Sequence, residues 1–333
     1  MSDPLLGLVF VFGIATSLVA SWVLVSRLER LGARIGLSEA LLGMLAALAA
    51  DAPEITAAVT ALVRHDRRIG AGVVIGSNVF NLAALLGLTA VVAGQISLHR
   101  RVIELGGVVA LWISGVSLAV VVGIVSPLVG LLLALAALTP YVVILGVRRE
   151  RLARTGLPLA WTRWLLAAIT EEELELEVAI HPRRGGARDG AIASVAVLVV
   201  VGASIAMERT GAELGGHHAV PGIVIGALVL AGVTSLPNAV AAVYLGARGR
   251  GAAVLSTALN SNALNVVGGL LIPTSILGLG APSGQTTFLA VCYLAFTLFA
   301  LASAYANRGL GRRVGLVIIA AYLTFGGVLI ANA

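Results

Sequence analysis

The residues best suited to chemistry are carboxylates, amides and hydroxyls that stand inside strongly apolar segments. Glu54 directly follows Pro53, and Asn238 directly follows Pro237. Proline breaks a helix and leaves carbonyl oxygens that can bind a cation where they line a cavity. Carboxylate, amide and carbonyl oxygens are the ligands that hard cations such as Ca²⁺ accept. We therefore predict a cation site with these side-chain ligands: Asp51, Glu54, Ser77, Asn81, Thr234, Ser235, Asn238, Ser261 and Asn265.

These residues belong to two copies of one pattern. The stretch AADAPEITAAV…GSNVFN matches VTSLPNAVAAV…NSNALN at a constant offset of 184 residues. The matched pairs are Pro53 with Pro237, Ser77 with Ser261, Asn78 with Asn262 and Asn81 with Asn265. Helix breaks and polar groups duplicated in apolar segments favour a transport site between two repeats. Asn78 and Asn262 are further candidate ligands, and for Ser77 and Asn262 a contact that only joins helices is the alternative to cation binding.

The composition is that of a polytopic membrane protein. The chain is 59% hydrophobic and 11% charged, with a mean hydropathy of +1.03. Its basic pI of about 10.4 comes from arginines in short loops, which membrane topology explains better than nucleic-acid binding does. The single cysteine, Cys292, excludes a disulfide framework and a thiolate metal cluster. The first apolar run, from Leu5 to Val25, is long enough to span, so we expect no cleaved signal peptide.

Apolar segments of about 20 residues, enough to cross a bilayer, recur along the whole chain. We predict ten transmembrane helices, with these approximate limits: 4–26, 36–63, 70–94, 102–123, 126–147, 190–207, 219–246, 252–273, 286–305 and 313–331. The first five-helix repeat is then 1–147, and its copy of the repeated pattern lies at about 43–87. The second repeat is 190–333, and its copy lies at about 227–271. Five crossings separate matching residues, so the two repeats have inverted topology.

The arginines predict the orientation, because loops on the cytoplasmic side carry an excess of positive charge. With the amino terminus outside, 18 arginines fall in inside loops and four in outside loops, of which Arg64 to Arg68 hold three. The linker 148–189 is then cytoplasmic, in the inner (plasma) membrane of a prokaryote-like cell. We expect an interfacial helix in this linker. A regulatory ion-binding role for its acidic cluster, Glu171 to Glu177, is the alternative.

The two motifs resemble the α-repeats of the Ca²⁺/cation antiporter superfamily, which includes the Na⁺/Ca²⁺ exchangers. The family pattern is a G-T-S-L-P-E-like break followed by G-S-N-x-F-N in the next helix. Gly76 to Asn81 fits the second motif completely, and Thr234 to Pro237 fits the first motif up to its acid. This resemblance covers about 80 residues. It implies an all-α fold of ten helices in two inverted repeats with broken helices at the midplane, and an outside amino terminus.

The departures from the family pattern concern charge. In the exchangers a glutamate follows the proline in both repeats, and the pair neutralises Ca²⁺. Here Glu54 is kept but Asn238 stands opposite it, while Asp51 is new. Asp51 precedes Glu54 by three residues, so the two would share a helix face if the turn stayed helical. Either both charges lie in the first repeat, or Asp51 faces a vestibule. Neighbouring carboxylates could share a proton, so Asp51 and Glu54 are the candidates for proton coupling.

We therefore expect a secondary antiporter that exchanges Ca²⁺ for Na⁺ or H⁺ by alternating access at a midplane site. A monovalent antiporter of the Na⁺/H⁺ type, with a retuned site, is the alternative. A channel and a homologue that does not transport are further alternatives. An intramembrane enzyme is not expected, because a duplicated asparagine-rich site has no obvious catalytic use. The expected partners are inorganic cations and the lipid bilayer, with no nucleic acid and no cofactor. The oligomeric state stays open.

Overall fold

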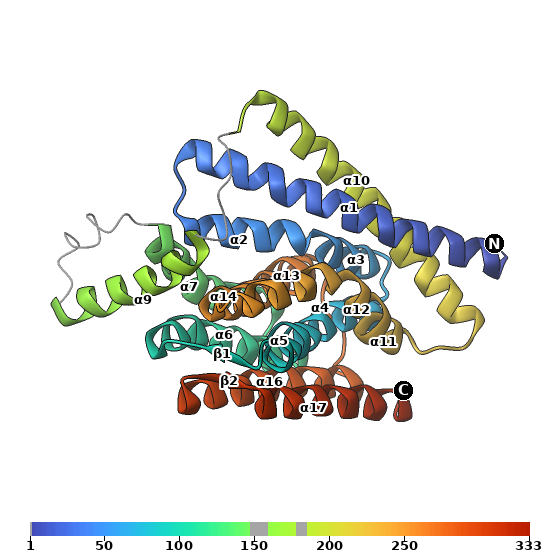
Figure 1. Cartoon of the computed structure of the whole chain (residues 1–333). Helices are drawn as coiled ribbons and strands as arrows, with labels where there is room; N and C mark the ends of the chain where they lie inside the picture. The colour runs from blue at the N-terminus through green and yellow to red at the C-terminus, as the bar shows by residue number, and fades with distance from the viewer. Residues whose placement is uncertain (1, 147–158, 178–184) are drawn as a thin grey trace.

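The computed structural model describes residues 2–146, 159–177 and 185–333, without the side chains of residues 39, 159, 161 and 171–177. Within these limits the chain is almost entirely helical (Figure 1). The first repeat contains α1 (Asp3–Ile35), α2 (Glu39–Ala50), α3 (Ala52–Val63), α4 (Arg67–Asn81), the π-helix η1 (Leu82–Leu88), α5 (Thr89–Ala93), α6 (Arg100–Val121) and α7 (Pro127–Gly146). The linker contains α9 (Leu159–Glu177). The second repeat contains α10 (Ala187–His217), α11 (Gly222–Val224), η2 (Ile225–Leu230), α12 (Ala231–Thr234), α13 (Leu236–Ala247), α14 (Gly251–Leu264), η3 (Asn265–Leu271), α15 (Ile272–Leu277), α16 (Gly284–Asn307) and α17 (Arg312–Ala331).

The described residues form the predicted set of spans. Eight helices are long and apolar enough to cross a membrane, and two helix pairs bent by 47° bring the number to ten. The bent pairs are α2 with α3 and the α11–α12 segment with α13. They fall where the sequence predicts helix breaks at Pro53 and Pro237. The predicted all-α fold with broken helices is therefore confirmed.

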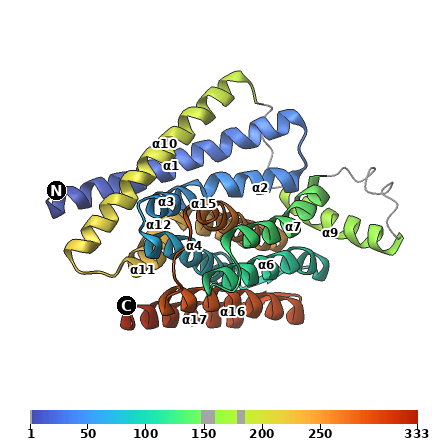
Figure 2. The same cartoon turned by 180° about the vertical axis from the view of Figure 1, so that it is seen from behind.

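The broken helices and the helices that follow them form the centre of the molecule. The α4–η1–α5 segment and the α14–η3–α15 segment are the most buried of the spans, with 94% and 78% of their apolar windows buried. Helices α6, α16 and α17 lie along one side of this centre, and α7 packs between α6 and α2 (Figures 1 and 2). A short antiparallel pair, β1 (Gln95–Ser97) with β2 (Gly309–Gly311), joins the ends of α5 and α16.

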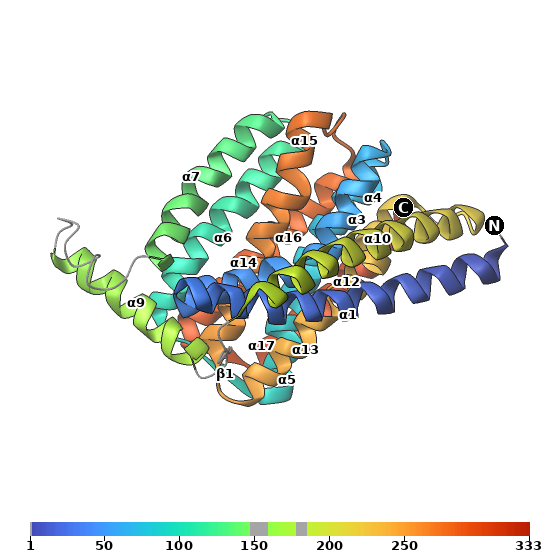
Figure 3. The same cartoon turned by 90° about the horizontal axis from the view of Figure 1, so that it is seen from above.

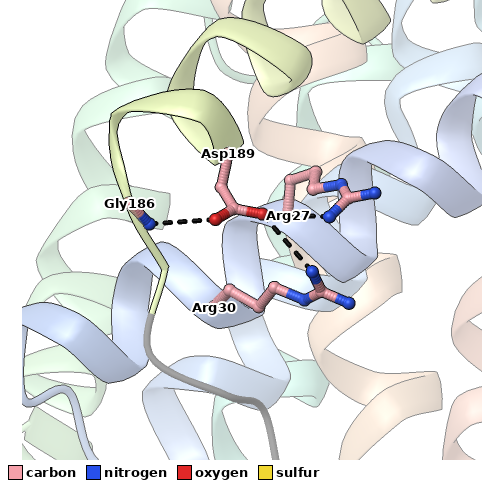
Figure 4. A network of polar contacts seen from close by, with 4 residues as sticks. All are labelled: Arg27, Arg30, Gly186 and Asp189. Carbon is pink, nitrogen blue, oxygen red and sulfur yellow. Dashed lines mark hydrogen bonds and ion pairs between the residues drawn. The ribbon is translucent and has the colours of Figure 1, made fainter.

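Helices α1 and α10 form a separate layer that lies obliquely over α2 and α3 (Figures 1 and 3). They are joined at a buried crossing, where Ser17 Oγ lies 2.8 Å from Ser204 Oγ. Toward one end, Asp189 accepts hydrogen bonds from Arg27 and Arg30 of α1, and its second oxygen accepts the Gly186 N–H at the start of α10 (Figure 4). This layer is therefore fixed both by apolar packing and by a half-buried ion-pair network.

Both helices of this layer are longer than predicted. Helix α1 continues to Ile35, beyond the predicted limit at 26, and α10 runs from Ala187 to His217, beyond 190–207. The fourth arginine that the topology predicts in an outside loop is Arg209, and it lies within α10, exposed, next to the buried Glu208. A helix can continue past its apolar run when such residues alternate between a buried and a solvated face.

The linker contains a helix where one was expected. Helix α9 packs on α2, α6 and α14, and Trp164 Nε1 donates to Glu104 Oε2 of α6 at 3.2 Å. The acidic cluster from Glu171 to Glu177 falls at the end of α9, but its side chains lie outside the described part, so its role stays a prediction.

Close backbone contact between the repeats supplies a first test of this fold. A Cβ on Gly76 of α4 would collide with the backbone of Ala227 in η2. We expect Gly76→Ala to lower the free energy of unfolding by about 1–3 kcal/mol, because neither backbone can move aside cheaply. Thermal unfolding in detergent measures this loss. Gly202→Ala in α10 is the matched control, since its Cβ would meet nothing within 4 Å. Equal stability of both variants would contradict the packing.

Candidate cation site

Each helix break bends at the residue two positions before its proline. Asp51 lies between α2 and α3 with φ −82° and ψ −4°, and Ser235 lies between α12 and α13 with φ −86° and ψ −2°. Pro53 has no N–H to bond the carbonyl of Ala49, four residues earlier. Ser21 of α1 replaces this donor, because its Oγ donates to Ala49 O at 2.9 Å. The break in the first repeat is thus stabilised from the neighbouring helix layer.

The two breaks meet face to face and bond each other twice. Asn238 Nδ2 donates to Asp51 Oδ1 at 2.8 Å, and Ser235 Oγ donates to Glu54 Oε1 at 2.8 Å. Shifting either contact by 184 residues gives the other, since Asp51 matches Ser235 and Glu54 matches Asn238. The same contact therefore occurs on both sides of a pseudo-two-fold axis. Both acceptors are carboxylates of the first repeat, and both donors are neutral groups of the second.

Asp51 lies in this central cluster and does not face a vestibule. Its side chain is fully buried, and its Oδ1 also accepts a hydrogen bond of 2.7 Å from Ser261 Oγ of α14. Ser261 accepts in turn from Asn81 Nδ2 at 3.1 Å. The residue that departs from the family pattern is therefore connected to groups of both repeats.

Asn78 and Asn262 join the helices that follow the breaks. Asn78 Nδ2 donates to Asn262 O, and Asn262 Nδ2 donates to Asn78 O, both at 3.1 Å. Their Oδ1 atoms accept from the other two asparagines: Asn81 Nδ2 donates to Asn262 Oδ1 at 3.0 Å, and Asn265 Nδ2 donates to Asn78 Oδ1 at 3.4 Å. The hydrogen-bonding groups of Asn78 and Asn262 are thus occupied by contacts between helices.

This network fixes the direction of the outer amides. Because the NH₂ groups of Asn81 and Asn265 donate to the inner pair, their Oδ1 atoms must point the other way. Both oxygens are buried and have no hydrogen-bond partner in the described part of the chain. A π-helix begins directly after Asn81, and another begins at Asn265. Such irregular turns occur frequently at functional sites, since they redirect side chains.

Four buried oxygens of this cluster therefore have no hydrogen-bond donor among the described residues. They are Asp51 Oδ2, Glu54 Oε2, Asn81 Oδ1 and Asn265 Oδ1, all on side chains that are 0% exposed. Leaving buried acceptors unpaired is costly, and leaving two carboxylates without a counter-charge is more costly still. No basic side chain among the described residues forms an ion pair with either acid. Cations or protons would satisfy these oxygens.

The other predicted ligands have different surroundings. Ser77 Oγ donates to Val73 O of its own helix at 2.5 Å, and Thr234 Oγ1 donates to Leu230 O at 2.8 Å. Both side chains are buried, and the only hydrogen bonds described for them stay within their own helical segments. Ser235, Ser261 and Asn238 instead bond the two carboxylates directly.

Sequence analysis overlooked two buried polar residues close to these elements. One is Ser21, which bonds the break at Ala49. The other is Glu208, which is 0% exposed and accepts from Arg64 at the end of α3 at 3.4 Å. Glu208 Oε1 has no partner in the described structure. The spacing of Ser204 and Glu208, one helical turn apart, would have indicated a shared polar face had the span been continued past residue 207.

One family model matches most of the chain. The model of the family described as sodium/calcium exchanger protein matches residues 5–148 and 190–331. In sequence, the chain is 31% identical over 84 residues to the antiporter candidate CaxA of Alkalimonas amylolytica. That alignment spans 25% of this chain and 26% of the relative.

Solved structures show the same fold at low sequence identity. The sodium–calcium exchanger NCX_Mj is similar with a TM-score of 0.62 and 18% identity, covering 97% of this chain and 98% of that one. The H⁺/Ca²⁺ exchanger CAX is similar with a TM-score of 0.68 and 14% identity, covering 98% and 86%. Native YfkE gives a TM-score of 0.65 and 15% identity, covering 99% and 93%.

The two kinds of asparagine in the cluster allow a second test. Asn262→Ala removes the donor to Asn78 O and the acceptor of Asn81, so we expect a loss of about 1–3 kcal/mol of unfolding free energy without added ions. Asn265→Ala removes one orphaned oxygen and a single long hydrogen bond. We expect it to change stability little but to reduce the rise in unfolding temperature on adding Ca²⁺. Identical behaviour of the two variants would contradict this division of roles.

Proposed function

Because the chain belongs to the sodium/calcium exchanger protein family, we propose that it is a secondary antiporter that exchanges Ca²⁺ for H⁺ or Na⁺. The observation that carries the proposal is the set of four buried oxygens without donors, on Asp51, Glu54, Asn81 and Asn265. The first repeat supplies both carboxylates, and each repeat supplies one amide. Together they form a ligand set of the kind that Ca²⁺ accepts. Asn238, Ser235 and Ser261 then hold the carboxylates in position.

The number of charges favours a divalent ion. A Ca²⁺ ion beside a single buried carboxylate would keep a net positive charge in an apolar interior, at a cost of several kcal/mol. With Asp51 in the cluster, two carboxylates neutralise it. The asparagine at position 238 suggested a site retuned for monovalent ions, but the second charge is displaced to position 51 and not lost. This removes the main reason for preferring the monovalent alternative.

The counter-ion must use the same groups. Asparagine does not titrate, so protons in this cluster can bind only to Asp51 and Glu54. When one Ca²⁺ ion leaves, two protons or two Na⁺ ions balance the charge of the two carboxylates. Each form neutralises the two carboxylates, whereas the empty form leaves both charges unpaired. Competition for one pair of carboxylates therefore gives coupling, because crossing without any ion is the costly step.

The burial of this cluster supports alternating access. The side chains of Asp51, Glu54, Asn81 and Asn265 are fully buried, so an ion can enter or leave only when helices move. Because the same contact occurs on both sides of the pseudo-two-fold axis, the two repeats can exchange roles. We place the amino terminus outside and the linker at the cytoplasmic face of a prokaryote-like inner membrane, on the arginine distribution alone.

The central test is a panel of ion gradients across proteoliposomes. We expect Ca²⁺ uptake driven by an opposing H⁺ or Na⁺ gradient, and a lower apparent Ca²⁺ affinity as the pH falls if protons share the carboxylates. Glu54→Gln should reduce uptake about a hundredfold or more, because one charge no longer balances the ion. Glu213→Gln, an exposed acid of α10, is the control. Unchanged uptake in Glu54→Gln would disprove the site, and flux insensitive to every countergradient would indicate a channel.

The displaced charge can be moved back. Asp51→Ser alone should abolish most Ca²⁺ uptake, because one carboxylate remains. The double variant Asp51→Ser with Asn238→Glu should restore it, since a serine would then donate to a glutamate in both copies of the contact that Ser235 and Glu54 now make. Uptake by the two variants, at equal amounts of folded protein, measures this rescue. If the double variant is as inactive as the single one, charge number is not what determines the ion.

A further inference from the structure

A buried carboxylate of α10 lies outside the cation cluster. Glu208 is 0% exposed, although it belongs to the layer of α1 and α10 and not to a helix break. Its Oε2 accepts from Arg64 Nη1 at 3.4 Å, and its Oε1 has no hydrogen-bond partner among the described residues. A charge buried in a membrane-spanning helix is costly and is usually functional. Glu208 therefore calls for a role that the cation cluster does not supply.

The partner of Glu208 stands on the helix that carries Glu54. Arg64 ends α3, and Glu54 lies in the first turn of the same helix. A positive charge is favoured at the carboxyl end of a helix, and here it also joins that end to α10. This contact gives a reason for an arginine on the side of the membrane where the topology predicts few of them.

The second repeat provides an internal comparison at the offset of 184 residues. Arg248 is the counterpart of Arg64 and likewise ends its helix, α13. The counterpart of Glu208 is Leu24 of α1, which is buried and apolar. Arg248 is exposed, and its guanidinium lies 4.2 Å from the centre of the Tyr244 ring of its own helix. Among the described residues, the ion pair therefore occurs in one repeat and has no copy in the other.

The packing of the helix layer has the same asymmetry. Helix α10 packs along α3, whereas α1 makes no comparable contact with α13 in the described part of the chain (Figures 1 and 3). If the two repeats exchanged roles, α1 would cover α13, and Leu24 could not pair with Arg248. The ion pair is therefore specific to the conformation in which α10 covers α3 and the cation cluster is closed.

We propose that Arg64 and Glu208 are a positioning pair for Glu54, which anchors α3 to α10 and so keeps the cation cluster closed in this conformation. The inference rests on the proposed cation exchange at that cluster. Because the cluster is fully buried, an ion leaves only when helices move apart. Separating α3 from α10 breaks the pair, so the pair opposes this opening. No equivalent pair opposes the movement in the exchanged conformation.

The unequal burial of the two partners predicts the order of the effects of substitution. Arg64→Gln leaves a buried charge without its partner, which favours open conformations that hydrate Glu208. Glu208→Gln leaves an arginine whose side chain is 45% exposed and already solvated. The double variant removes both charges, so we expect it to open α3 no more than Glu208→Gln alone does. Arg64→Lys keeps the charge and should behave nearly as the unaltered chain does.

Hydrogen–deuterium exchange followed by mass spectrometry measures the anchor on the whole chain without any added ion. The amides of α3 should exchange about tenfold faster in Arg64→Gln, and about threefold faster in Glu208→Gln and in the double variant, as expected for a pair with one buried partner. The matched control is Arg248→Gln, which removes the corresponding arginine of the second repeat. It should leave exchange in α3 unchanged.

The rate of Ca²⁺ release connects the anchor to the cluster. Stopped-flow mixing with a fluorescent chelator should show faster release in the same order of variants, with Arg64→Lys and Arg248→Gln close to the unaltered chain. Exchange in α3 as slow in Arg64→Gln as in Arg248→Gln, or a double variant more open than Arg64→Gln, would overturn the inference. Unchanged Ca²⁺ release despite faster exchange would also overturn it, since the pair would then only join two helices. If the unaltered chain bound no Ca²⁺, the proposed exchange would fail, and the order of amide exchange would still decide whether the pair anchors α3.

Discussion

Two carboxylate oxygens and two amide oxygens are buried in an apolar bundle with no donor among the described residues to pair with them. An unpaired acceptor costs free energy in such an environment, and an unpaired charge costs more. The surrounding hydrogen bonds all limit this cost without removing it. Each carboxylate has one oxygen bonded by a neutral donor, and the second oxygen is left for a cation or a proton. A structure that satisfied every oxygen internally would be more stable and would have nothing to bind.

The pseudo-two-fold axis explains how this arrangement is held. Asn78 and Asn262 bond each other across the axis with backbone and side chain, and their remaining oxygens accept the NH₂ groups of Asn81 and Asn265. Amide groups are directional, so fixing the nitrogen end of a side chain fixes the oxygen end as well. Symmetry thus yields two correctly directed ligands from one repeated contact. The close packing of α4 against η2, which Gly76 permits, keeps the halves at the distance that this contact requires.

The sequence predicts the helices, the two breaks and the residues of the cluster, because proline and polar residues in apolar segments are strong local signals. It leaves the roles of Asn78 and Asn262 open, since only the contacts across the axis show that their polar groups join the helices. The position of Asp51 was equally open, because its role depends on Asn238 and Ser261 from the other repeat. Glu208 and Ser21 were overlooked for a related reason: each acts on an element distant in sequence, and no duplicated pattern marks it.

The broken symmetry of charge has a counterpart in the packing. Both carboxylates belong to the break between α2 and α3, and it is this break that α1 and α10 cover, with Ser21 bonded to its carbonyl (Figure 1). The helix that follows the neutral break, α13, is covered less than the break itself, because Val240 and Tyr244 are 69% and 53% exposed while Ser235 is 0% exposed. Desolvated charge requires a fixed, polar and well-packed environment, whereas amide and hydroxyl groups tolerate a looser one. Placing both charges in one repeat therefore makes the cluster asymmetric: the first repeat holds the carboxylates, and the second supplies the neutral donors that bond them.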